Sequence, residues 1–220
     1  MATAFPRRME VVQRQTRRRG STDDRVWATQ NDDRVVAVLA DGAGGVPGGA
    51  EAAQLVVDGV RELCRKRAFP STPQGLCALL TRLDEDIHRV HQAGETTAIV
   101  VVAAGGTFIG ASCGDSECWV VDRDEHQIAT ADQIRKRLGS RRSRPVHFGP
   151  LVLGERRVLL ASDGLTGHAS PAKLLSACRA PSLEEAASAL VETPRTSDGS
   201  YDDDVSIVLL DACAGLSDSS

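Results

Sequence analysis

The stretch VVAVLADGAGG, residues 35–45, contains the junction that decides the fold. Its first six side chains are apolar, and the run ends abruptly at Asp41. Short apolar runs rich in β-branched residues are typical of buried strands. Gly42 follows at once, and a glycine lets the backbone turn and pass close to a bound group. The pattern therefore predicts a buried strand that carries a carboxylate at its end.

Working outward from this strand, strand-like and helix-like segments follow one another irregularly. Apolar runs predict strands at residues 26–28, 97–104, 108–113, 118–122, 158–161 and 205–210. Amphipathic periodicity predicts helices at 50–67 and 74–91, and capping residues predict helices after Ser170 and Ser182. Residues 139–150 and 193–204 are expected to be loops. Because the two long helices are consecutive, we favour an α+β layered fold over a doubly wound sheet.

Length and composition indicate a globular protein. The 220 residues are 41% hydrophobic, 25% charged and 3% aromatic, with a formal net charge of −4. These values exclude a fibrous or largely disordered chain, and they argue against a nucleic-acid partner. No apolar run reaches the roughly 20 residues of a membrane helix, and the first residues lack a signal-peptide core. We expect one domain over residues 1–214, a disordered tail at 215–220, and a cytoplasmic location.

Aspartates at strand ends form the candidate functional set. They are Asp23, Asp24, Asp41, Asp115, Asp163 and Asp203. Strands that end at one edge bring such carboxylates close together, where they repel unless a cation lies between them. Oxygen ligands suit Mg²⁺ or Mn²⁺. A single Asp-Gly pair after a strand is more often only a turn, so the joint occurrence is what favours a metal site.

The order of these motifs resembles that of the metal-dependent serine/threonine protein phosphatases of type 2C, in their short bacterial form. The similar stretches are DGAGG at 41–45, ETTA at 95–98, GDS at 114–116, ASDGLT at 161–166 and DDVSIV at 203–208. The resemblance extends from about residue 19 to residue 210. It implies a β-sandwich of two antiparallel sheets flanked by helices, with metal ions at one edge.

The resemblance also implies a set of metal ligands. Asp41 would bridge two ions, and Asp163 and Asp203 would complete the first site. The carbonyl oxygen of Gly42 would bind the second ion. The cofactor would be Mg²⁺ or Mn²⁺, as two ions with a third as an option.

The remaining candidate residues receive their roles from the same resemblance. Asp23 and Asp24 would bind an ion or orient its water, and Asp24 counts among the catalytic residues. Asp115 would serve a weaker third metal site, and Arg19 would bind the substrate phosphate. A water bridging two ions would then hydrolyse phosphoserine or phosphothreonine in proteins.

Departures from the family pattern leave alternatives open. Ala43 stands where many members carry a histidine, so another general acid is required. Asp204 stands where an asparagine is usual, so either Asp203 or Asp204 faces the metal, because a one-residue shift exchanges the two faces of a strand. One alternative function is an inactive pseudo-phosphatase that binds a phosphoprotein or a kinase. Another is a switch phosphatase that acts on one small regulatory protein.

Partners and the substrate-facing loop complete the expectations. We expect a monomer whose substrate is a phosphoprotein made by a Ser/Thr kinase, with no nucleic-acid or membrane partner. Residues 139–150 take the place of the family's mobile flap. Their arginines would face the substrate's negative charge, or would simply be solvated.

Overall fold

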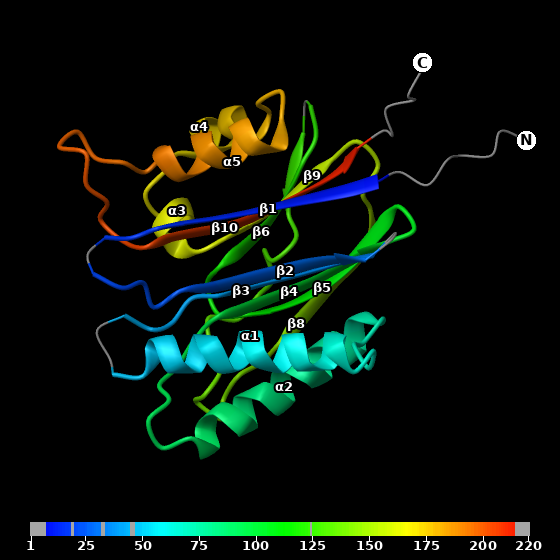
Figure 1. Cartoon of the computed structure of the whole chain (residues 1–220), viewed down its shortest axis with the longest axis vertical. Helices are drawn as coiled ribbons and strands as arrows, with labels where there is room; N and C mark the ends of the chain where they lie inside the picture. The colour runs from blue at the N-terminus through cyan, green and yellow to red at the C-terminus, as the bar shows by residue number, and fades with distance from the viewer. Residues whose placement is uncertain (1–7, 19, 32–33, 45–46, 124, 214–220) are drawn as a thin grey trace, which may run out of the picture.

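The computed structural model describes residues 8–18, 20–31, 34–44, 47–123 and 125–213. These residues form two five-stranded antiparallel sheets stacked face to face, with helices on both outer faces (Figure 1). The predicted β-sandwich is thereby confirmed. The tail expected at residues 215–220 lies outside the described residues.

Each sheet combines segments that are distant in the sequence. The first sheet has the order β1 (Arg8–Thr16), β10 (Val205–Cys213), β9 (Arg157–Ala161), β6 (Glu117–Val121) and β7 (His126–Ile128). The second has the order β2 (Arg25–Asn31), β3 (Arg34–Ala40), β4 (Ala98–Ala104), β5 (Thr107–Cys113) and β8 (Val146–Val152). Helices α3 (Asp163–Thr166), α4 (Pro171–Cys178) and α5 (Leu183–Glu192) lie on the side of the first sheet, and α1 (Gly49–Arg65) and α2 (Pro73–Arg89) cover the second.

Strand β3 shows why an unbroken apolar run was required. Successive side chains of a strand point to opposite faces. Val35 and Leu39 contribute to the core between the two sheets, whereas Val36 and Val38 contribute to the core beneath α1 and α2. Both faces are buried from Val35 onward, so no position between Arg34 and Asp41 carries a polar side chain.

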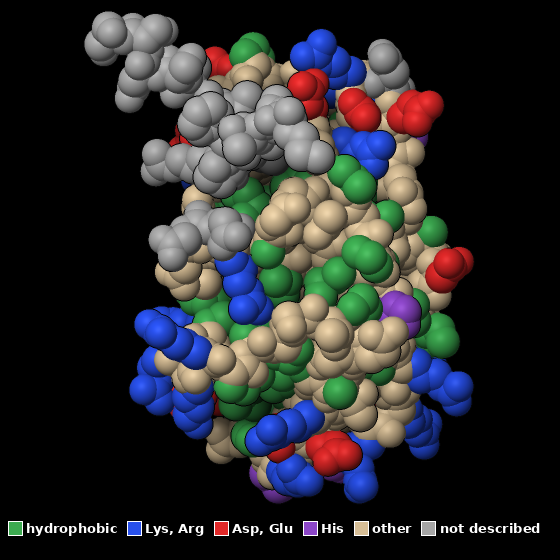
Figure 2. All heavy atoms as spheres, turned by 90° about the vertical axis from the view of Figure 1, so that its right-hand side faces the viewer, with side chains coloured by type: hydrophobic (Ala, Val, Ile, Leu, Met, Phe, Trp, Pro, Cys, Tyr) green, Lys and Arg blue, Asp and Glu red, His purple; other side chains and the backbone are tan. Residues whose placement is uncertain are grey.

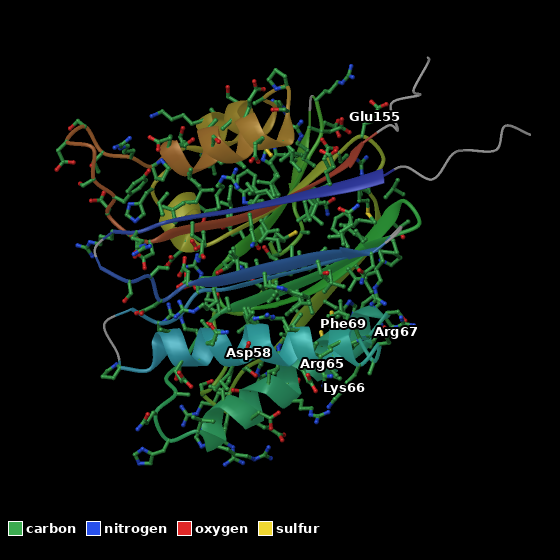
Figure 3. All side chains as sticks on the ribbon, in the orientation of Figure 1. Asp58, Arg65, Lys66, Arg67, Phe69 and Glu155 are labelled. Carbon is green, nitrogen blue, oxygen red and sulfur yellow. The ribbon has the colours of Figure 1, made fainter. Side chains whose placement is uncertain are left out.

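The two long helices end close to where the periodicity predicted. Helix α2 begins after Thr72, whose side chain accepts a hydrogen bond from the amide of Gly75 at 3.1 Å. Helix α1 is followed by a turn in which Arg67 has a φ of 55°. Arg65, Lys66 and Arg67 gather at this end (Figure 3), where positive charge is favourable for the helix dipole.

The sequence-based predictions failed at three strands, all of which lie at the edges of the sheets. Strand β1 was not predicted, because polar residues alternate along an edge of the sheet that is only partly buried. The loop expected at 139–150 ends early, since β8 begins at Val146. Its Gly149–Pro150 pair hid the strand, although an edge strand tolerates a proline. The short strand β7 was also missed.

None of the helices in the described ranges is both long enough and apolar enough to cross a membrane.

Candidate metal centre

The ends of four strands meet at one edge of the sandwich, at the left in Figure 1. Arg25 pairs with Ala40, so Asp24 before β2 lies beside Asp41 after β3. Ile207 pairs with Ala161, which brings the start of β10 beside the segment that leads to Asp163. The opposite end of the sandwich faces the viewer in Figure 2 and shows charged side chains of both signs around apolar ones. The strand pairing therefore brings Asp24 beside Asp41, and the start of β10 beside the Asp163 segment.

Serine and glutamine side chains join the strands beneath this edge. The amide of Ser206 donates to Oγ of Ser162, and the amide of Ser162 donates to the carbonyl of Ser206, both at 3.0 Å. Gln15 Nε2 donates to Oγ of Ser206 at 3.0 Å and to the carbonyl of Asp24 at 3.2 Å. These contacts hold β1, β9 and β10 against the residue that precedes β2. These residues were not predicted, because serines in strands carry no distinctive sequence signal.

Asp41 lies close enough to two other predicted aspartates for their carboxyl groups to interact with its own. The side chain of Asp41 interacts with those of Asp24 and Asp163. Burial is the main cause that raises the pKa of Asp41 well above the usual carboxyl value, and the charges of Asp24 and Asp163 raise it further. Burial also raises the pKa of Asp24, whose side chain is only 3% exposed. Without a counter-ion, these groups therefore tend to hold protons.

The backbone around Asp41 is held by two threonines of the ETTA stretch. The amide of Asp41 donates to Oγ1 of Thr97 at 3.0 Å. Its carbonyl accepts from the amide of Thr97 at 2.8 Å and from Oγ1 of Thr96 at 2.9 Å. Oγ of Ser116 lies 2.7 Å from Oγ1 of Thr97. The carboxylate of Asp41 therefore extends from a fixed base.

Gly42 is required by close packing. A Cβ at this position would lie 2.5 Å from backbone atoms of Gly49 and 2.7 Å from the carbonyl oxygen of Asp23. These distances are shorter than a Cβ atom tolerates, so Gly42 packs directly against the start of α1 and against the backbone of Asp23. The Gly42 backbone thus remains beside the carboxylates, as its predicted role as a carbonyl ligand requires.

The structure gives Asp203 and Asp204 different surroundings. The carboxylate of Asp204 accepts hydrogen bonds from the amides of Arg18 at 2.8 Å and Asp23 at 3.2 Å. Asp203 is exposed, and its Oδ1 accepts from the amide of Asp204 at 2.8 Å. Its Cβ faces Gly164, the residue after Asp163. Asp204 therefore ties the amino-terminal segment to β10, while Asp203 lies beside the Asp163 turn.

The remaining predicted residues lie around this group. Asp115 follows Gly114, whose φ is 111°, and its Oδ2 is 3.6 Å from Nη2 of Arg137. Asp23 is half-buried, with its amide bound to Asp204. Arg19, the predicted phosphate ligand, lies outside the described residues. Arg137 was not predicted, because nothing in the sequence indicates that residue 137 approaches residue 115.

The donor set fits a hard divalent cation. The three touching carboxylates are oxygen donors, the class that Mg²⁺ and Mn²⁺ prefer. Two buried oxygens, Asp24 Oδ2 and Asp115 Oδ1, have no hydrogen-bond partner in the described part of the chain. Within the described ranges, no group of three or more Asp, Glu, His or Cys side chains is already arranged so that it could hold a metal ion. Asp24, Asp41 and Asp163 instead form a chain of contacts centred on Asp41.

Fold and site together define a domain of the type 2C phosphatase class. The family model described as "Stage II sporulation protein E (SpoIIE)" matches residues 31–212, and the chain belongs to this family. The predicted family resemblance is thereby confirmed. No curated protein sequence matches the chain.

Solved structures share the fold over nearly the whole chain. The catalytic domain of the phosphatase PstP in complex with two manganese ions is 23% identical, with a TM-score of 0.78, and covers 93% of this chain and 98% of its own. The Mycobacterium tuberculosis serine/threonine phosphatase PstP/Ppp is 22% identical, with a TM-score of 0.78 and coverage of 93% and 99%. RsbX in complex with magnesium is 15% identical, with a TM-score of 0.73 and coverage of 92% and 94%. These identities establish the fold.

Proposed function

We propose that this protein is a metal-dependent phosphatase that hydrolyses phosphoserine or phosphothreonine in proteins. The observation that carries the proposal is the contact of Asp41 with both Asp24 and Asp163, which reach it from different strand ends. Buried carboxyls that lie together either keep a proton or share a cation, and a divalent cation allows all of them to stay ionised. The structural neighbours PstP and RsbX, which contain manganese and magnesium respectively, support this choice of cofactor.

The residues divide into ion-binding and orienting groups. Asp41 and Asp163 would hold the ions, with Asp203 beside them and the carbonyl of Gly42 as a neutral ligand. When bound, divalent cations supply Lewis-acid activation of a water nucleophile and offset the charge of the phosphoryl group. Thr96 and Thr97 fix the position of Asp41 through its backbone. Asp24 would orient the water from its buried position.

The substrate side of the proposal extends to residues at the rim. Arg19 would bind the phosphate in a bidentate manner, which suits an arginine better than a lysine. Asp23 would orient water at the ions, and Asp115 would bind a weaker third cation. The substrate would be a cytoplasmic protein that a Ser/Thr kinase has phosphorylated.

Loss of the central carboxylate tests the proposal directly. We expect Asp41→Asn to lower Mn²⁺-dependent hydrolysis of p-nitrophenyl phosphate and of a phosphothreonine peptide by at least about 100-fold, since a direct ligand contributes more than an outer-shell partner. The matched control is Asp58→Asn, on α1 (Figure 3), where the side chain is 56% exposed. Its activity should equal that of the wild type, and EDTA should abolish both.

Two outcomes would contradict the proposal. Turnover that persists in EDTA would exclude a metal-dependent reaction. A wild-type protein that binds Mn²⁺ and the phosphopeptide without turnover would instead support the binding-only alternative.

A further inference from the structure

A buried carboxylate on α2 organises a segment that the proposed chemistry does not use. Asp84 is 4% exposed and accepts four hydrogen bonds from residues 139–143. The donors are the amides of Gly139 at 2.6 Å, Arg141 at 3.1 Å and Ser143 at 3.4 Å, and Oγ of Ser143 at 2.6 Å. Hydrogen bonds to an ionised carboxylate are stronger than those between neutral groups. Asp84 therefore fixes this segment to α2.

The fixed segment continues directly into a strand-like contact. Leu138 exchanges two backbone hydrogen bonds with Thr96, at 2.8 and 3.1 Å. Gly139 packs so closely that a Cβ there would lie 2.4 Å from the carbonyl oxygen of Gly94. The carbonyl of Lys136 accepts from Sγ of Cys113 at 2.7 Å. Residues 136–139 thus lie against residues 94–96 at several points.

Residues 94–96 in turn hold the loop that carries the central ligand. Oγ1 of Thr96 donates to the carbonyl of Asp41 at 2.9 Å. The amide of Ala43 donates to the carbonyl of Glu95, and that of Gly94 to the carbonyl of Gly48, both at 2.8 Å. The segment 136–139, the segment 94–97 and the residues at 41–44 and 47–49 are therefore stacked in succession, and Asp84 anchors the outermost segment.

The same anchored segment carries the cation nearest to Asp115. Arg137 lies two residues before Gly139, and its Nη2 is 3.6 Å from Oδ2 of Asp115. Its carbonyl accepts from Oγ of Ser140 at 2.7 Å, which closes the turn that Asp84 binds. The position of Arg137 thus depends on the anchored turn.

We propose that Asp84 is a positioning residue which, through the 136–143 segment, places the Asp41–Gly42 loop for binding of divalent cations and sets the Arg137 guanidinium beside Asp115. The proposal rests on the proposed function, because it assumes that the Asp41 site binds metal. Asp84 touches neither the ions nor the substrate. Its effect passes through backbone contacts of residues 94–97.

The test measures Mn²⁺ affinity by titration calorimetry, independently of activity. Asp84→Asn keeps the shape of the side chain but removes its charge and one acceptor oxygen. We expect the Mn²⁺ dissociation constant to rise by about threefold to tenfold, the range for a residue that acts through a chain of contacts. Hydrogen exchange at the amides of Gly139 and Arg141 should accelerate in parallel.

Two control variants separate positioning from general loss of stability. Asp86→Asn lies two residues further along α2 with an exposed side chain, and it should bind Mn²⁺ as the wild type does. Leu190→Ala opens a cavity beneath α5 in the other helical layer, so it should lower stability without changing Mn²⁺ affinity. If Asp84→Asn does not fold, Ser143→Ala removes only the 2.6 Å contact and should show a smaller shift in the same direction.

The outcomes distinguish this proposal from the one on which it rests. A wild-type protein that binds no Mn²⁺ would overturn the proposed function. A wild-type protein that binds Mn²⁺, with an unchanged constant in Asp84→Asn or Ser143→Ala, would overturn only the positioning role. An equal shift in Leu190→Ala would also overturn it, since the effect would then follow from stability.

Discussion

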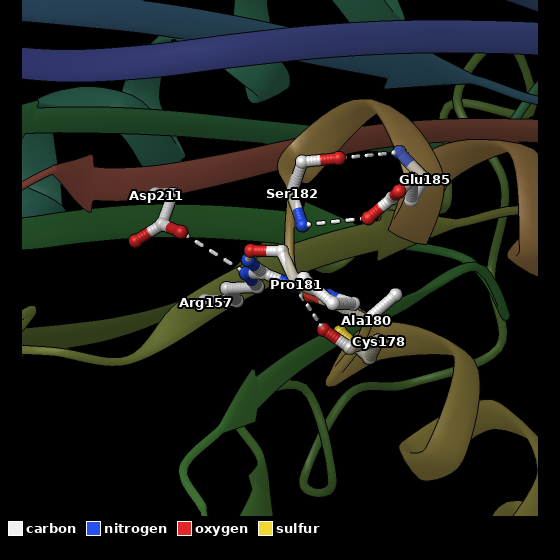
Figure 4. A network of polar contacts seen from close by, with 7 residues as sticks. All are labelled: Arg157, Cys178, Ala180, Pro181, Ser182, Glu185 and Asp211. Atoms are coloured by element: carbon white, nitrogen blue, oxygen red, sulfur yellow. Dashed lines mark hydrogen bonds and ion pairs between the residues drawn. The ribbon is translucent and has the colours of Figure 1, made fainter.

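The two ends of the β9–β10 strand pair handle buried charge in opposite ways. At one end, Arg157 and Asp211 form an ion pair at 3.0 Å, with side chains only 14% and 19% exposed (Figure 4). Arg157 also donates to the carbonyls of Cys178, Ala180 and Pro181, at 2.8, 2.6 and 3.3 Å. At the other end, Asp41 interacts with Asp163 and with Asp24, and no comparable cation is among the described residues that act on Asp41.

The difference between the Asp211 end and the Asp41 end indicates a structural role for the first and a binding role for the second. The chain supplies its own cation beside Asp211, so that end is complete as folded. At the Asp41 end, the charges of Asp24 and Asp163 raise the pKa of Asp41, so on the proposed function a cation from solution would stabilise the folded chain. A structural ion pair and the proposed cation site thus share the same two strands.

The largest effect on stability should follow from removing the internal cation. Arg157→Met leaves the Asp211 carboxylate and three carbonyls without their donor. We expect the free energy of unfolding to fall by about 3–5 kcal/mol, as for other broken buried ion pairs. Chemical denaturation measures the loss.

The neighbouring arginine provides the matched control for that experiment. Arg156 pairs with Asp122 at 3.3 Å on the surface, and Arg156→Met should change stability little. Mn²⁺ affinity should stay at the wild-type value in both variants. A weaker Mn²⁺ affinity in Arg157→Met would show that the two ends are not independent.

A smaller effect should follow from supplying the missing cation. Asp24 and Asp41 have raised pKa values in the folded protein, so the folded state keeps protons that the unfolded chain has released. Without metal, stability should therefore fall as the pH rises from about 5.5 to about 8. Mn²⁺ at about 100 times its dissociation constant should restore about 2.7 kcal/mol at the higher pH.

Thermal melting in EDTA and in Mn²⁺, at both pH values, measures this dependence. The gain from Mn²⁺ should be smaller at the lower pH, because protons compete with the ion for the carboxylates. The prediction fails if the metal-free protein becomes more stable as the pH rises over this interval and Asp41→Asn shows the same dependence of stability on pH. That result would contradict an uncompensated charge at the Asp41 end.

The smallest effect on stability should follow from replacing the buried carboxylate of Asp24. Asp24→Asn removes one of the mutually repelling groups, so the metal-free protein should gain about 1 kcal/mol at high pH, close to the value of one pKa unit. Its stability should also depend less steeply on pH than that of the wild type. Asp86→Asn, an exposed change on α2, should reproduce neither result, and an Asp24→Asn protein as pH-dependent as the wild type would contradict this assignment.

Much of the fold was predictable where burial leaves a periodic or continuous pattern. The apolar run of β3 and its abrupt end at Asp41 indicated a strand with a carboxylate at its tip. The edge strands β1 and β8 were missed, because only part of each is buried and β8 contains Pro150. The terminal aspartates were visible for the same reason as β3: each interrupts or borders an apolar run.

The sequence alone determined that aspartates stand at the strand ends, because the buried strands that carry them must be apolar throughout. Only the tertiary structure decided which of them meet. Asp41 touches Asp24 and Asp163 because antiparallel pairing brings distant strand ends together. The contacts of Asp84 with residues 139–143, and of Arg137 with Asp115, depend on how α2 and β5 pack. Contacts of that kind join residues tens of positions apart and leave no periodic trace along the chain.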